Sequence, residues 1–203
     1  MIDPFADLPK GHFGAILADP PWQFQNLWNT PAGPNRGDAA HYGTMTLEDI
    51  CGLPVESVAA DNCVLFMWGI WILLPRLLDV IEEWGFKYKT CAFDWMKANA
   101  GQIDMFREDN NVQMGMGYWT RANTEPCLLA TRGKPKRLNA DVRQGIIEPR
   151  REHSRKPDCV HERIERLVAG PYLELFARRS RPGWTTWGNE ATKFDRPNLE
   201  AAE

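Results

Sequence analysis

A short stretch near the start of the chain, Ala18-Asp19-Pro20-Pro21-Trp22, combines residue types that could hold a flat ligand bearing an amine. Each proline fixes its φ near about −65° and has no backbone N–H, and the residue before a proline is pushed out of the helical region. The segment is therefore stiff, and its carbonyl oxygens can accept hydrogen bonds from a ligand. Asp19 adds a carboxylate acceptor, and Trp22 adds a ring on which a base could stack.

The chemistry suited to this stretch is methyl transfer to an exocyclic amine such as N6 of adenine. That nitrogen is a poor nucleophile, because its lone pair is delocalised into the ring. Two acceptors, each taking one amine hydrogen, would localise the lone pair and aim it at an electrophilic methyl group, which is catalysis by positioning and electrostatics. A base in a duplex would have to be flipped out to reach the pocket. A Pro-Pro turn with Trp22 as a core plug is the structural alternative, and these residues alone leave both interpretations open.

Apolar runs and turn residues around this stretch predict an α/β fold with a largely parallel sheet flanked by helices. Strands are expected over residues 13–18, 63–68, 86–97, 125–131 and 172–179. Helices are expected from Thr46, over residues 71–84 and from Pro157 onward. Ligands of such folds bind beyond the carboxyl ends of the strands, and Asp19 directly follows the strand over 13–18.

Two polar loops, 23–43 and 98–117, are long enough to suggest a role in substrate contact. The stretch 133–156 is expected to be irregular, and the run 132–156 contains many more Arg and Lys residues than acids. A solvated surface loop and a track for nucleic-acid phosphates both account for this run. The track is preferred, because the run ends beside the expected active site and an acidic enzyme needs local positive surface to hold phosphates.

Composition bounds the class of protein. The chain has 203 residues and a formal net charge of −3, which favours one domain and argues against a polybasic nucleic-acid binder. Its five cysteines are widely spaced without a C-x-x-C pair, so neither a disulfide framework nor a zinc site is expected. No secretory signal and no bilayer-spanning run is evident. These features predict a cytoplasmic protein without membrane contact.

Histidines offer little sign of a metal site. His161 falls within an amphipathic helix and is interpreted as a surface residue, while His153 suits a loop-ordering role. His41 precedes Tyr42 in the loop over 23–43, where a substrate contact and a packing role are equally open. Because no H-x-x-x-H or H-x-E pattern and no suitable acidic cluster is present, no metal is expected.

Beyond these residues, the chain resembles the adenine-N6 methyltransferase family whose members carry a D-P-P-W motif. The matching segments follow the family's order: ADPPW, HYGTM (41–45), VLFMWG (64–69), the block 115–135, HSRKPD (153–158), the segment 164–179 and PGWTTWGNE (182–190). The short bacterial and phage members look most similar. The resemblance implies a Rossmann-like methyltransferase domain over residues 1–190, with a polar, flexible tail over 191–203. It also implies S-adenosylmethionine as the cofactor.

Site roles follow from the resemblance. Catalytic roles fall on Asp19, Pro20, Pro21 and Trp22, and His41 and Tyr42 join Trp22 in holding the base. Lys156 would meet the methionine carboxylate of the cofactor, beside the start of the helix from Pro157, where an anion is favoured. The other cofactor contacts would come from Ile2, Asp3, Asp19, Glu174, Arg178, Asn189 and Glu190. Relatives often carry Gln where this chain has Glu190, and the segment 178–184 lacks a His-Asn pair, so the ribose contacts there depart from the pattern.

The sequence therefore predicts methyl transfer from S-adenosylmethionine to adenine N6 in nucleic acid, with DNA preferred by resemblance to the short members. An RNA adenine-N6 methyltransferase and a non-catalytic nucleic-acid-binding paralogue that needs a partner are the alternatives. Methylation of cytosine N4 or of a protein amide is a further one. A homodimer or a partner subunit is compatible with the chain. Replacing Asp19 or Trp22 by Ala is expected to abolish transfer without unfolding the protein.

Overall fold

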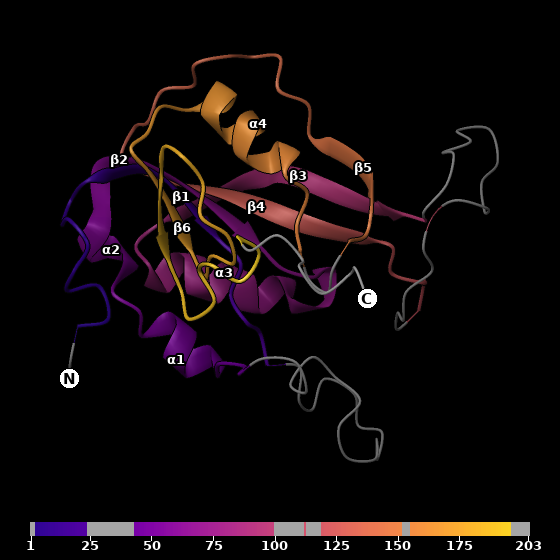
Figure 1. Ribbon diagram of the computed structural model, residues 1–203, viewed down its shortest axis with the longest axis horizontal. Coiled ribbons are helices and arrows are strands. Elements are labelled where there is room, and N and C mark those ends of the chain that lie inside the picture. The colour runs from indigo at the N-terminus through magenta and orange to yellow at the C-terminus, as the bar shows by residue number, and fades with distance from the viewer. Residues whose placement is uncertain (1–2, 24–42, 100–111, 113–118, 152–154, 196–203) are drawn as a thin grey trace, which may run out of the picture.

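The apolar runs form the centre of a seven-stranded sheet with helices packed on both of its faces (Figure 1). The computed structural model describes residues 3–23, 43–99, 112, 119–151 and 155–195. In chain order the elements are β1 (Phe13–Ala18), α1 (Leu47–Cys51), α2 (Val55–Val58), β2 (Ala59–Trp68), the 3₁₀ turn η2 (Trp71–Leu73), α3 (Leu74–Glu83), β3 (Lys87–Ala98), β4 (Thr124–Arg132), β5 (Gly145–Pro149), α4 (Cys159–Leu167), β6 (Tyr172–Leu175) and β7 (Trp184–Trp187).

The sheet has the strand order β5-β3-β4-β2-β1-β6-β7. β4 runs antiparallel to both of its neighbours, β2 and β3, whereas the other neighbouring pairs are parallel. Among the described strands, β4 is therefore the one reversed strand in an otherwise parallel sheet. The predicted α/β fold, Rossmann-like and largely parallel, is confirmed.

Two hydrophobic cores lie on opposite faces of the sheet. Ile16 and Ala18 of β1 belong to the core shared with α1, α2 and α3, while Ala15 and Leu17 belong to the core shared with α4. Because both faces of β1 and β2 are covered, every second side chain finds an apolar partner on each side. This double burial explains why the two strands read as continuous apolar runs rather than as alternating ones.

The ends of α1 and α3 match their sequence signals. Thr46 is the N-cap of α1, and its side chain accepts a hydrogen bond from the backbone N–H of Asp49 at 3.1 Å. Gly85 follows α3 with a φ of +80°, a left-handed conformation that glycine adopts without steric cost. Trp84, fully buried between them, donates its indole N–H to the carbonyl of Ile50 at 2.9 Å and ties α3 to α1.

Three local expectations were wrong. β5 lies inside the stretch 133–156 that was expected to be irregular, and α4 begins at Cys159 rather than at Pro157. The strand expected over 172–179 ends at Leu175, because Phe176 adopts a left-handed φ of +61° that cannot continue a strand. In the described part of the chain, no helix has the length and apolar character needed to cross a membrane.

The turn after β6 is supported by the end of β7. Gly188 lies so close to this turn that an added Cβ would come within 2.9 Å of the Ala177 nitrogen and 3.0 Å of the Phe176 carbonyl carbon. Gly183 has a left-handed φ of +82°, but an added Cβ there would meet nothing within 4 Å. Gly188 therefore combines a steric demand with a φ of +156°, whereas Gly183 has a conformational demand alone.

Gly188→Ala should destabilise the protein more than Gly183→Ala. A left-handed alanine costs about 1–2 kcal/mol, whereas overpacking against a backbone adds about 1–3 kcal/mol. Chemical denaturation of the two variants measures the difference. Equal losses of unfolding free energy would mean that the turn yields without cost.

Candidate active site

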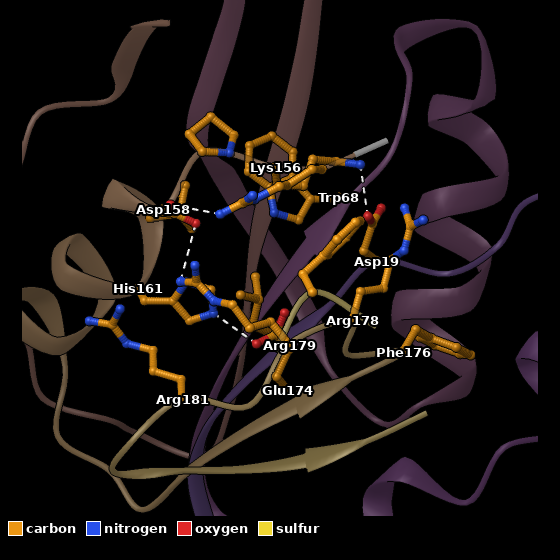
Figure 2. A pocket seen from close by; sticks show the side chains of 15 residues that line it. Asp19, Trp68, Lys156, Asp158, His161, Glu174, Phe176, Arg178, Arg179 and Arg181 are labelled. Carbon is orange, nitrogen blue, oxygen red and sulfur yellow. Dashed lines mark hydrogen bonds and ion pairs between the residues drawn. The ribbon is translucent and has the colours of Figure 1, made fainter. Parts of the chain in front are cut away.

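Asp19 lies where the sheet changes its order of connection. β1 is flanked by β2, the next strand along the chain, and by β6, which comes much later. Such switch points leave a crevice beyond the carboxyl ends of the strands. A cleft is found there, lined by Asp19 and Trp68 from the ends of β1 and β2, by the segment before α4, and by residues of β6 and the turn after it (Figure 2).

Lys156 and Asp19 point toward one another across this cleft (Figure 2). Their Nζ and Oδ2 atoms are 2.8 Å apart, and only 16% of the lysine side chain and 25% of the aspartate side chain are exposed. Burial raises the pKa of the Asp19 carboxyl above its ordinary value, and attraction by the Lys156 ammonium offsets part of that rise. The pair presents one negative and one positive group at the same point.

Lys156 is held at both its backbone and its ammonium group. Arg151 donates to the Lys156 carbonyl at 3.2 Å, which fixes the loop that carries the lysine. Glu125, at the start of β4, lies 3.7 Å from Nζ and also forms an ion pair with Lys97. Burial raises the pKa of Glu125, but Lys156 and Lys97 outweigh it, so the net shift is downward. Glu125 is therefore an ionised second partner of Lys156, and no pattern in the sequence pointed to it.

Both proline carbonyls of the motif already accept a hydrogen bond. The Pro20 oxygen accepts from the N–H of Trp22 at 2.8 Å, and the Pro21 oxygen accepts from the N–H of Met45 at 2.9 Å. A carbonyl oxygen has two lone pairs, so each can accept one more bond. These two contacts hold the turn in a single shape and connect it to the chain just before α1.

Trp22, the last residue of the motif, lies in the core. It is 7% exposed, and its indole N–H donates to the Trp68 carbonyl at 3.2 Å. Two roles were open for this ring from the sequence, a stacking face for the target base and a plug in the core. In the structure its contacts are those of a support for the turn that carries Asp19.

On the opposite wall of the cleft, Glu174 of β6 meets His161 of α4. Their Oε2 and Nε2 atoms are 2.8 Å apart (Figure 2). The imidazole packs edge-on against Trp184, with ring centroids 4.8 Å apart. The interpretation of His161 as a surface residue was wrong, because its side chain is only 14% exposed. Its place one turn before the buried Ile164 was a signal for this, since residues three apart share a helix face.

Arg178 connects the cleft to the end of the described chain. Its Nε lies 3.2 Å from Oε2 of Glu190, and its guanidinium carbon is 4.9 Å from the ring centre of Phe194. Phe194 also packs against Arg155 at 5.5 Å and lines the cleft. Arg178 and Glu190, predicted as cofactor contacts, are thus brought together. Of this pair Arg178 lines the cleft, whereas neither Glu190 nor its neighbour Asn189 is among the lining residues.

The remaining predicted site residues are not gathered here. Asp3 binds Lys10 at 2.6 Å and accepts from the Phe5 N–H at 2.9 Å, and it is not among the residues that line the cleft. The predictions for Ile2, His41, Tyr42 and His153 fall outside the described residues. The described residues contain no cluster of His, Cys, Asp and Glu suited to a metal ion.

The cleft suits a ligand with a zwitterionic end and several hydroxyl groups, as S-adenosylmethionine has. Lys156 and Asp19 complement a carboxylate and an ammonium group, and the Glu174 carboxylate can accept from hydroxyls. Trp68 adds a donor: its indole nitrogen is buried at the cleft and has no hydrogen-bond partner within the described part of the chain. Buried polar groups without a partner are rare, so a ligand or water is expected to satisfy this one.

Comparison with known proteins identifies the family. The model of the MT-A70 family matches residues 13–190. The chain belongs to the MT-A70 family. The chain is 33% identical over 202 residues to the type II methyltransferase M.MunI of a Mycoplasma species, covering 92% of this chain and 81% of that protein. It is 30% identical to the Arabidopsis thaliana MT-A70-like N(6)-adenosine-methyltransferase and 29% identical to the human catalytic subunit METTL3.

These matches confirm the resemblance to adenine-N6 methyltransferases, and the protein is an enzyme of that family. The relatives differ in how much of their length this chain spans. The matched region is 89% of this chain but only 24% of the Arabidopsis protein and 28% of the human one, so the chain spans about a quarter of each. The bacterial relative is of similar size, because this chain spans 81% of it.

Trp22→Phe and Trp22→Ala should differ in stability. The structure changes the expectation that Trp22→Ala leaves the fold intact, because removing a buried Trp side chain costs about 3–5 kcal/mol. Trp22→Phe keeps most of the packing and loses the bond to the Trp68 carbonyl, a loss of about 1 kcal/mol. Denaturant titration followed by circular dichroism measures both. If Trp22→Ala unfolds at the wild-type midpoint, the ring does not support the motif.

Proposed function

We propose that this MT-A70 enzyme transfers a methyl group from S-adenosylmethionine to N6 of adenine in nucleic acid, with DNA as its preferred substrate. The observation that carries the proposal is the Asp19–Lys156 pair, which stands at the head of the cleft beyond β1. S-adenosylmethionine, when bound, supplies an electrophilic methyl group. The protein's own contribution is to bind, to orient and to attract hydrogens of the amine.

The cofactor contacts fall on residues that already form ion pairs around the cleft. Lys156 would bind the methionine carboxylate, and Asp19 and the Trp68 N–H would bind other polar groups of that end. Glu174, oriented by His161, and the Arg178–Glu190 pair would hold the ribose side. Asp3 and Asn189 are retained as contacts for the adenine end on family resemblance alone, as is Ile2.

Asp19 would take one hydrogen of the target amine, and a carbonyl of Pro20 or Pro21 would take the other. An amine held by two acceptors has its lone pair localised and directed at the methyl group. Accepting this hydrogen requires an ionised Asp19, whose pKa is raised by burial. Activity should therefore fall as the pH drops through that raised pKa. The base itself would be walled by the segment that contains His41 and Tyr42.

DNA is preferred because the relative of comparable length is a type II methyltransferase. RNA is the second candidate, favoured by the names of the Arabidopsis and human relatives, of which this chain matches only about a quarter. Specificity would come from the loops 23–43 and 98–117, from the run 132–156, or from a second copy or partner subunit. A cytoplasmic location is part of the same proposal.

Nucleoside mass spectrometry tests the reaction and its substrate together. The protein is incubated with S-adenosylmethionine and, separately, with duplex DNA, single-stranded DNA or RNA, and the digested pools are searched for N6-methyladenine. We expect N6-methyladenine in the DNA pools and at least a thousandfold less with Asp19→Asn, since removing one electrostatic contact to the reacting group costs roughly 10²–10³ and the amide also loses the charge. Asp79→Asn, an exposed change on α3, is the control.

The possible results of this experiment distinguish the mechanism, the substrate and the catalytic competence of the protein. Undiminished transfer by Asp19→Asn would remove the mechanism, and N6-methyladenine only in RNA would move the substrate to RNA. Methylated cytosine N4 or a methylated protein amide would replace the target. Cofactor binding without transfer to any pool points to a missing partner, whereas no cofactor binding favours the non-catalytic paralogue.

Lys156→Met should weaken cofactor binding ten- to a hundredfold, because a hydrogen bond to a charged group contributes about 1.5–3 kcal/mol. Glu125→Gln keeps the lysine but removes one of its carboxylate partners, so a smaller loss is expected. Lys89→Met, an exposed change on β3, serves as the control. Isothermal titration calorimetry with S-adenosylmethionine measures all three, and wild-type affinity in Lys156→Met would contradict the assignment.

A further inference from the structure

Two basic segments that are distant in sequence meet at the rim of the Asp19 cleft. The first is residues 150–158, before α4, and the second is residues 178–181, after β6. Together they contain seven cations, Arg150, Arg151, Arg155, Lys156, Arg178, Arg179 and Arg181, against the two acids Glu152 and Asp158. The whole chain has a net charge of −3. Positive charge is therefore concentrated by the fold at this one place.

Asp158 gathers three of these arginines. Its carboxylate lies 2.6 Å from Nη1 of Arg151 and 3.3 Å from Nη2 of Arg155. It also lies 3.2 Å from Nη2 of Arg179 (Figure 2). Burial raises the pKa of Asp158, but its arginine partners outweigh that effect and lower it. Asp158 is the N-cap residue of α4, yet its side chain makes no cap hydrogen bond. Its carboxylate is instead committed to ordering the guanidinium groups.

Three other cations of the two segments each have a carboxylate partner of their own. Lys156 has Asp19, Arg178 has Glu190 and Arg181 has Glu165 at 3.1 Å. The trio of Arg151, Arg155 and Arg179 gathers three positive charges around the carboxylate of Asp158. A guanidinium presents five N–H donors in a rigid fork, and this geometry matches the oxygens of a phosphate.

The trio is accessible and adjoins the reaction site. The side chains of Arg151 and Arg179 are 32% and 33% exposed, and that of Arg155 is 19% exposed. Arg155 and Arg179 line the same cleft as Asp19. A planar guanidinium group that an ion pair holds in place at the surface suits bidentate binding of a phosphate.

We propose that Arg151, Arg155 and Arg179, ordered by Asp158, form a docking surface for the phosphates of the nucleic-acid strand whose adenine is presented to Asp19. This inference rests on the proposed function. An acidic protein that binds a polyanion needs such a concentrated positive surface, because phosphate neutralisation supplies most of the non-specific affinity. The run 132–156 supplies one half of the surface, and the segment after β6 completes it.

Arg179→Gln tests the surface most directly. Arg179 comes from the turn after β6, whereas Arg151 also fixes the Lys156 loop, so its loss would have two effects. Arg166→Gln is the matched control, since Arg166 is an exposed arginine at the other end of α4 that pairs with Asp141 at 2.7 Å. Fluorescence anisotropy measures binding of labelled duplex DNA, single-stranded DNA and RNA at a series of salt concentrations.

We expect Arg179→Gln to bind every sequence about five- to tenfold more weakly at low salt. The slope of log K against log[salt] should fall by about one, as expected for one lost phosphate contact. Its KM for nucleic acid should rise with little change in kcat. Calorimetry with S-adenosylmethionine is the companion measurement, because Arg179 lines the cleft proposed for the cofactor; a loss of cofactor affinity as large as the loss of nucleic-acid affinity would overturn the inference. Arg166→Gln should match wild type in all of these. Arg155→Gln repeats the test if Arg179→Gln does not fold.

The inference is overturned if Arg179→Gln, or Arg155→Gln in its place, has the affinity and salt slope of Arg166→Gln. The trio would then only stabilise the segment that carries Lys156. An unchanged slope with weaker binding, or no nucleic-acid binding by the wild-type protein, would overturn it as well. Binding that follows the predicted slopes while no pool is methylated would leave this surface standing and refute the proposed function. Methylation with an unaffected Arg179→Gln would do the reverse.

Discussion

The ion pair between Asp19 and Lys156 joins residues 137 positions apart in the chain, and the rest of the site is arranged around it. Removing two charges from water is costly, and a buried pair is worth having only when its remaining hydrogen-bonding capacity is also satisfied. Glu125 and Lys97 extend the pair into an alternating row of charges, and Arg151 fixes the lysine backbone. Each charge in this row is therefore compensated by a neighbour rather than by solvent.

The reversed direction of β4 is what brings Glu125 into this row. In a wholly parallel sheet, the first residues of a strand lie at the edge opposite the cleft. β4 runs the other way, so its amino end lies beside the carboxyl ends of its neighbours β2 and β3. A sheet that is mixed at one position can thus contribute residues from both strand beginnings and strand ends to the same site.

Much of the architecture could be predicted from the sequence, because strands buried on both faces, such as β1 and β2, are continuous runs of apolar residues. The D-P-P-W motif and Lys156 were likewise recognisable. The sequence could not reveal the direction of β4, and so Glu125 was overlooked. β5 was missed because its short alternation, with Ile146 buried and Ile147 exposed, lies among basic residues. The burial of Trp22 depends on tertiary contacts that no local pattern encodes.

Phe176 has a consequence of a different kind. A bulky side chain with a left-handed φ of +61° is conformationally strained, commonly by about 1–3 kcal/mol, and this one lines the cleft. The fold tolerates it because Trp187 packs edge-on against its ring and Gly188 leaves room for its backbone. A glycine at this position would relieve the backbone strain but would remove the ring that lines the cleft. Backbone stability and the shape of the cleft thus place opposite demands on residue 176.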